Sequence, residues 1–163
     1  MNSFQELAQS IDWTSLAHAL LRVIGVFLCL TVHETCHGLA AYALGDPTAK
    51  RERRLSLNPL HHIDWFGLAA MLLVGFGWAK PVPVDMRYFK KPKQGMALTA
   101  LAGPASNLLL SVLLLFAARL VLGHYVDTAL CAGALDFLLM TAYMSIGLGL
   151  FNLIPISPLD GSK

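Results

Sequence analysis

The chain has 163 residues, of which 56% are hydrophobic and only 13% carry a charged side chain. Soluble globular domains contain about 25% charged residues, so the composition excludes an ordinary soluble domain. It is typical of a membrane protein whose main partner is the lipid bilayer. The net charge of +2 is too small to indicate nucleic-acid binding.

The first long apolar stretch runs from Val23 to Leu44, and its 22 residues are enough to cross the hydrocarbon core as one helix. The Gly-Asp-Pro sequence at 45–47 ends it. Residues 1–22 contain apolar positions at helical spacing. We expect them to form an N-terminal segment that lies in the membrane interface.

The region after the first span is basic and polar over residues 50–64. A brief alternation of apolar and polar residues at 55–57 predicts a short strand or an extended segment. Residues 65–78 are apolar but number only 14, too few for a helix that crosses the bilayer. We therefore expect a re-entrant or interfacial segment between the first and second spans.

Two further apolar stretches, at 96–122 and 129–151, are each long enough to span the bilayer. The predicted fold class is therefore an all-α polytopic membrane protein with three transmembrane helices in one core domain, residues 1–163. Along the second span, small or polar residues share one helix face, where another helix can approach closely. These residues are Thr99, Ala100, Gly103 and Asn107.

The distribution of lysine and arginine predicts the orientation of the spans. The region between the first two spans is strongly basic, whereas the loop at 123–128 has no lysine or arginine. The basic residues are Lys50, Arg51, Arg53, Arg54, Lys80, Arg87, Lys90, Lys91 and Lys93. By the positive-inside rule we expect this region to be cytoplasmic, together with the C-terminal ends of the first and third spans.

The first span contains the sequence His33-Glu34-Thr35-Cys36-His37, which fits the H-E-x-x-H pattern. Histidines at i and i+4 lie about 6 Å apart on one helix face and can bind one zinc ion. Glu34 can then act as the general base on a metal-bound water. The competing interpretation is a pair of hydrogen-bonded core histidines. Because charged groups are costly inside a bilayer, the membrane setting favours the metal.

A catalytic zinc usually has three protein ligands, so two histidines are not enough. Asp160 follows the predicted cytoplasmic end of the third span, and the two histidines lie in the cytoplasmic half of the first. Topology therefore nominates Asp160 as the third ligand. The alternative is an ordinary turn aspartate, because Asp-Gly is a common turn dipeptide.

Four motifs together resemble the site-2 protease family of intramembrane zinc metalloproteases. They are "HETCHG" (33–38), "GWAKPVPV" (77–84), "GPASN" (103–107) and "FNLIPISPLDG" (151–161). The resemblance covers the chain from about residue 25 onward, and the motifs occur in the family's order. It corresponds to a short form of the family without a PDZ-like domain.

The resemblance implies a role for each matching residue. His33, His37 and Asp160 would bind one Zn²⁺ per chain, Glu34 would be the catalytic base, and Asn152 would contact the substrate or the transition state. Asn107 would have a supporting role. The implied activity is hydrolysis of peptide bonds in transmembrane segments of protein substrates. Together with the charge distribution, we expect a multi-pass protein of the plasma membrane with the active site toward the cytoplasm.

The chain departs from the family pattern at three places. Serine stands at position 157, where proline is frequent, and cysteine at position 36, where a small apolar residue is frequent. The family usually continues past the Asp-Gly pair with another hydrophobic helix, whereas the sequence ends at Lys163. We therefore expect a truncated chain.

Two other functions compete with proteolysis at this stage. One is a catalytically silent membrane homologue that binds client helices without cutting them, which the intact set of site residues disfavours. The other is a metal transporter or sensor. A transporter is expected to show polar residues along a path through several spans, and the second and third spans offer few. The oligomeric state is not predicted.

Overall fold

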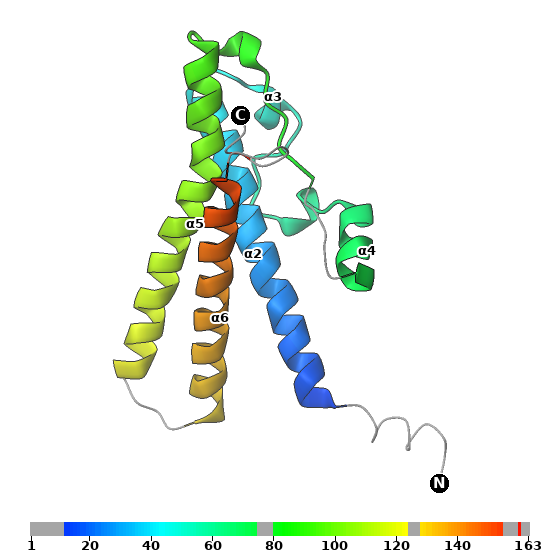
Figure 1. Ribbon diagram of the computed structural model, residues 1–163, viewed down its shortest axis with the longest axis vertical. Coiled ribbons are helices and arrows are strands. Elements are labelled where there is room, and N and C mark those ends of the chain that lie inside the picture. Colours follow the sequence, from blue (N-terminus) through cyan, green and yellow to red (C-terminus); the bar gives the residue numbers. More distant parts are fainter. Residues whose placement is uncertain (1–11, 75–79, 124–127, 155–159, 161–163) are drawn as a thin grey trace.

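The computed structural model describes residues 12–74, 80–123, 128–154 and 160, and these form helices and loops without a β-strand (Figure 1). The three longest helices are α2 (Trp13–Ala43), α5 (Pro92–Gly123) and α6 (Ala129–Asn152). Each is long and apolar enough to cross a membrane. The predicted all-α fold with three membrane-spanning helices is confirmed.

Helix α2 begins at Trp13, well before the predicted start of the first span at Val23. Asp12 caps the helix, because its side chain accepts hydrogen bonds from the backbone N–H groups of Thr14 and Ser15, at 3.0 and 3.2 Å. The residues between the cap and Val23 contain no helix breaker. They continue the helix of the first span without a break at residue 22. Residues 1–11 of the predicted interfacial segment lie outside the described residues, and its location in the interface stays a prediction.

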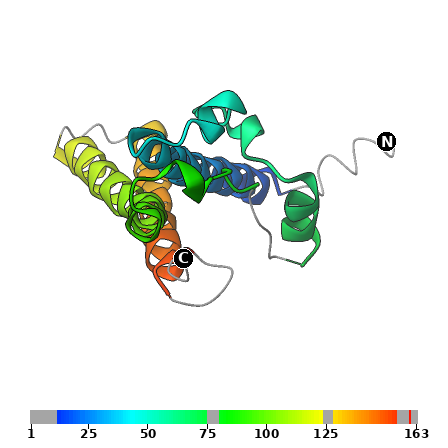
Figure 2. The same ribbon diagram turned by 90° about the horizontal axis from the view of Figure 1, so that it is seen from above.

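The three long helices pack side by side, with α5 and α6 antiparallel and α2 against both (Figures 1 and 2). Small residues lie at the contacts. A Cβ atom on Gly149 of α6 would come within 3.1 Å of the Pro104 carbonyl oxygen of α5. A Cβ on Gly25 of α2 would come within 2.9 Å of Thr141 Oγ1 on α6. Close approach at small residues is the usual basis of helix packing in membranes.

The small-residue face predicted on the second span is the buried face of α5. Its four residues, Thr99, Ala100, Gly103 and Asn107, are all buried. Pro104 lies inside the helix, where proline interrupts the hydrogen-bond ladder. Figure 1 shows that α5 changes direction along its length, and a bend is the expected effect of an internal proline.

Short elements gather around the C-terminal end of α2: the helix α3 (Thr48–Arg51) and the 3₁₀ turns η1 (Pro59–His61) and η2 (Met86–Tyr88). The alternation at 55–57 does not form a strand within the described residues. Instead, the Ser56 carbonyl accepts hydrogen bonds from Thr35 Oγ1 at 2.9 Å and His62 Nε2 at 2.8 Å. The segment is therefore bound to α2 and its own loop, and the strand alternative is wrong.

Helix α4 (Trp65–Val74) stands apart from the bundle in both views (Figures 1 and 2). The backbone N–H of Lys80 donates to the carbonyl of His62 at 2.9 Å, so the chain returns after α4 to the level from which it left. Phe66 and Leu73 are 83% and 84% exposed. This agrees with the predicted re-entrant segment, of which residues 75–78 lie outside the described part.

Candidate metal centre

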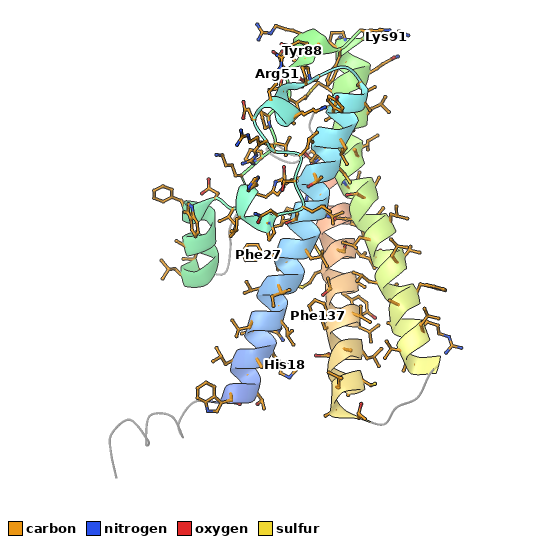
Figure 3. The ribbon with its side chains drawn as sticks, turned by 180° about the vertical axis from the view of Figure 1, so that it is seen from behind. His18, Phe27, Arg51, Tyr88, Lys91 and Phe137 are labelled. Carbon is orange, nitrogen blue, oxygen red and sulfur yellow. The ribbon has the colours of Figure 1, made fainter. Side chains whose placement is uncertain are left out.

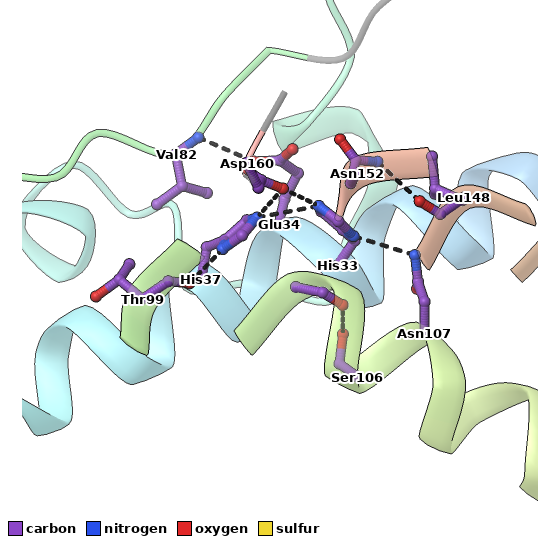
Figure 4. A network of polar contacts seen from close by, with 11 residues as sticks. His33, Glu34, His37, Val82, Thr99, Ser106, Asn107, Leu148, Asn152 and Asp160 are labelled. Atoms are coloured by element: carbon purple, nitrogen blue, oxygen red, sulfur yellow. Dashed lines mark hydrogen bonds and ion pairs between the residues drawn. The ribbon is translucent and has the colours of Figure 1, made fainter. Parts of the chain in front are cut away.

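Three potential metal ligands from two distant parts of the chain meet beside α5 (Figure 4). His33 and His37 are one turn apart on α2, and Asp160 follows α6. The Nε2 atoms of His33 and His37 lie 3.0 Å apart, and each lies 2.9 Å from Asp160 Oδ2. The three residues are buried, with exposed fractions of 3%, 6% and 7%. This group could hold a metal ion.

The hydrogen bond at Nδ1 of His37 is compatible with a metal cation at the centre of this group. His37 Nδ1 lies 2.6 Å from the Thr99 carbonyl oxygen, which can only accept, so Nδ1 carries a proton and donates it. If the ring is neutral, its Nε2 lone pair points toward the carboxylate of Asp160, which is also an acceptor. A metal cation between these two atoms, which lie 2.9 Å apart, would satisfy both.

The spacing of the three ligand atoms also fits a metal. Ligands around a tetrahedral zinc at 2.0–2.1 Å are separated by about 3.3 Å. The observed separations of 2.9–3.0 Å are slightly shorter. Imidazole nitrogen and carboxylate oxygen are both ordinary zinc ligands, so the donor set and its spacing fit this ion.

Asn107 of α5 contacts the other side of the His33 ring. Its Nδ2 lies 3.1 Å from His33 Nδ1, and its buried Oδ1 has no partner among the described residues. A half-turn of the amide would exchange the two atoms, so that Oδ1 accepts from a protonated Nδ1. Asn107 can therefore orient the ring in the tautomer that leaves Nε2 free to bind a metal. The backbone carbonyl oxygen of Asn107 accepts a separate hydrogen bond from Ser145 Oγ of α6 at 2.8 Å.

Gly103 allows α5 to approach the two histidines. A Cβ atom at this position would lie 2.6 Å from His37 Cε1 and 2.7 Å from His33 Nε2. Neither ring can move away freely, because His37 is bound to the Thr99 carbonyl and His33 to Asn107. Helix α5 therefore packs directly against both histidine rings but contributes no ligand to the centre.

We expect Gly103→Ala to disrupt the centre, because the added methyl group occupies space next to both Nε2 atoms. Overpacking of this kind costs about 1–3 kcal/mol, and here it also displaces ligands. The measurement is metal bound per purified chain, together with thermal stability. Gly133→Ala in α6 is the matched control, because nothing lies within 4 Å of its Cβ position. Equal metal content in the two variants would contradict this role of Gly103.

Glu34 lies between the two histidines in sequence and is held from outside the helix. Its Oε2 atom accepts a hydrogen bond from the backbone N–H of Val82 at 3.0 Å (Figure 4). Within the described residues its Oε1 atom accepts no hydrogen bond. One carboxylate oxygen is thereby fixed, and the other remains available to a proton donor.

Asn152 is the last residue of α6. Its Nδ2 donates to the Leu148 carbonyl at 2.9 Å, within its own helix (Figure 4). In this arrangement the amide N–H group is used by the helix end, and a contact with substrate would require the side chain to turn. The catalytic role of Asn152 stays a prediction.

Two contributors to the centre were not predicted: the Val82 N–H group and the Thr99 carbonyl. Both are backbone groups, which every residue has, so no side-chain pattern identifies them. The one available signal was the pair of prolines at 81 and 83, which leaves Val82 as the N–H donor between them.

Comparison with known proteins found relatives that carry metalloprotease names. The chain is 42% identical over 143 residues to the Bacillus subtilis protein named "Putative zinc metalloprotease YwhC". The aligned region covers 86% of this chain and 65% of the relative. It is 32% identical over 149 residues to the Mycolicibacterium smegmatis protein named "Putative zinc metalloprotease Rip2". This aligned region covers 87% of this chain and 54% of the relative. A Mycobacterium tuberculosis protein of the same name is also 32% identical, over 145 residues.

The chain thus spans between about half and two thirds of the length of these relatives. No protein-family model matches it. No solved structure matches it either.

Proposed function

We propose that this chain is the membrane-embedded core of a zinc metalloprotease of the site-2 protease family. The observation that carries the proposal is the meeting of His33, His37 and Asp160 within 3.0 Å of one another, beside Glu34, in helices able to span a membrane. The names of the relatives support zinc as the metal and proteolysis as the reaction.

The residues divide the chemistry between them. His33, His37 and Asp160 would hold zinc, which lowers the pKa of a bound water and polarises the substrate carbonyl. Glu34 would accept the water proton on its open oxygen and pass it to the departing amine. Asn152 would donate to the developing oxyanion after turning from the Leu148 carbonyl.

The proposed substrate is a transmembrane segment of another membrane protein. An open apolar hollow of about 450 Å³ lies between α2 and α6. Its lining residues are Val26, Cys29, Leu30, Met144, Gly147, Leu148 and Phe151. Leu30 lies one helical turn before Glu34, and Leu148 is the residue whose carbonyl binds Asn152. Both walls of the hollow therefore lead toward the centre, as lateral entry of an apolar helix requires.

The proposed location is the plasma membrane, with the centre toward the cytoplasm. Arg51 and Lys91 lie at one end of the bundle and His18 at the other (Figure 3). The positive-inside rule assigns the basic end to the cytoplasm. His37 is six residues, about 9 Å along the axis, from the end of α2 at Ala43, so the centre lies nearer to that face than to the opposite one.

The proposed function predicts zinc-dependent cleavage of a membrane-spanning substrate by the purified protein in lipid vesicles. A single-span reporter protein should be cut within its apolar segment, as shown by mass spectrometry of the fragments. Chelation should abolish cleavage, and added zinc should restore it, because the zinc supplies the activated water.

The same vesicles separate the competing functions. A silent homologue would bind the reporter without cutting it, and a transporter would move zinc into the vesicle lumen. The proposal fails if reporters known to be cut by a site-2 protease bind this protein, loaded with zinc, and stay intact.

A further inference from the structure

Residues 80–85 form an irregular strap that crosses α2 beside Glu34. The strap is fixed near both ends: Lys80 N–H donates to the His62 carbonyl at 2.9 Å, and Asp85 N–H donates to Asp46 Oδ2 at 2.7 Å. Its middle residue, Val82, is buried against α2, where a Cβ on Gly38 would lie 3.2 Å from Val82 Cγ1. The strap is thus held in place along its length.

Arg54 is a buried arginine that binds this strap. Its Nη2 donates to the Lys80 carbonyl at 2.6 Å and to the Pro81 carbonyl at 3.3 Å. Within the described residues it forms no ion pair, and its buried Nε atom has no hydrogen-bond partner. Burying a guanidinium in this way is costly, so its contact with the strap calls for a functional explanation.

The contact with Pro81 leads directly to Glu34. The carbonyl of Pro81 and the N–H of Val82 belong to one planar peptide group, and in a trans peptide they point in opposite directions. Arg54 binds the carbonyl at 3.3 Å, and Glu34 binds the N–H at 3.0 Å. One peptide group therefore connects a guanidinium to the carboxylate beside the metal ligands. Hydrogen bonds arranged in series polarise one another, so the guanidinium strengthens the N–H as a donor.

The prolines on both sides of Val82 restrict the backbone around this peptide group. Pro81 and Pro83 have no N–H group, so Val82 supplies the single backbone donor of this tripeptide. Their fixed φ angles also limit the movement of the strap. The position of the Val82 N–H then depends on what binds the strap, and Arg54 binds it at two adjacent carbonyls.

We propose that Arg54 is a positioning residue for Glu34 and acts through the Pro81–Val82 peptide group. The inference rests on the proposed protease function, in which Glu34 receives the water proton. Arg54 binds the strap, and the Val82 N–H binds Oε2 of Glu34. The Oε1 atom is then available to accept the proton from water. Arg54 touches neither substrate nor metal.

The kinetic test uses Arg54→Met, with Arg53→Met as the control. Arg53 is the exposed neighbour, and its replacement removes the same charge from the same loop. We expect Arg54→Met to lower kcat by about 10- to 100-fold at unchanged KM and zinc content. The reason is that Glu34 is misplaced, whereas the metal ligands and the substrate-binding surface are unchanged. Arg54→Lys keeps a cationic donor and should recover part of kcat. It also carries the test if Arg54→Met does not fold.

A second measurement needs no catalysis. The amide exchange rate of Val82, measured by NMR on ¹⁵N-valine-labelled protein, should rise about tenfold or more in Arg54→Met and stay unchanged in Arg53→Met. The proposal is overturned if kcat of Arg54→Met equals that of Arg53→Met, if zinc is lost in parallel with activity, or if Val82 exchange is unaffected. If the wild-type protein, loaded with zinc, binds the reporter and leaves it intact, the function on which the inference rests is rejected instead.

Discussion

Replacing Glu34 with glutamine is expected to abolish cleavage and to leave the bound zinc in place. The amide retains the size of the carboxylate and can still accept a hydrogen bond from Val82 N–H, but it cannot take up a proton from water. General acid–base groups contribute about 10²- to 10⁴-fold to rates, so a loss of this size in kcat is expected. The measurement is cleavage of the vesicle-bound reporter beside zinc content per chain.

Glu52→Gln is the matched control, because Glu52 is an exposed glutamate in the loop after α3. It should cleave at the wild-type rate. Two results would contradict the role assigned to Glu34. Cleavage at the wild-type rate by Glu34→Gln would show that another group takes the proton. Loss of zinc from this variant would show that Glu34 is needed to hold the metal.

Asp160→Ala is expected to remove most of the zinc from the purified protein and, with it, all cleavage. The substitution deletes the one ligand that does not come from α2, and two histidines alone leave the ion without the usual third protein ligand. It also leaves the Nε2 atoms of His33 and His37, 3.0 Å apart, without the carboxylate between them. Zinc per chain, measured after dialysis against a weak chelator, should fall from about one to well below half.

Asp136→Ala serves as the control for this variant. Asp136 is an aspartate of α6 whose side chain is 60% exposed and pairs with His18 at 3.5 Å, far along the helix from the centre. It should retain wild-type zinc content. If Asp160→Ala binds zinc as tightly as Asp136→Ala, the third ligand is another residue and the assembled centre is not the one described.

The helical architecture could be predicted from the sequence because it depends on local properties. The length and hydropathy of a segment decide whether it can span a bilayer. The pairing of His33 with His37 is also local, because the α-helix places residues i and i+4 on one face. Helix α2 begins at Trp13, before the apolar stretch that starts at Val23, because the Asp12 cap and not hydropathy fixes where the helix starts.

The third ligand needed information of longer range. Topology and the family resemblance nominated Asp160, but only the fold places its Oδ2 atom 2.9 Å from both histidines. The turn-aspartate alternative was equally compatible with the Asp-Gly dipeptide. Burial of the side chain between two imidazoles is a property of the assembled helices.

The sequence by itself determined that this protein is helical, resides in a membrane and carries a histidine pair with a glutamate in its first span. Only the tertiary structure decided how that pair is completed and held. The Thr99 carbonyl orients His37, Gly103 makes room for both rings, and the Val82 N–H holds Glu34. These contributions come from backbone atoms or from the absence of a side chain, so their effect depends on position in space and leaves little trace in residue type.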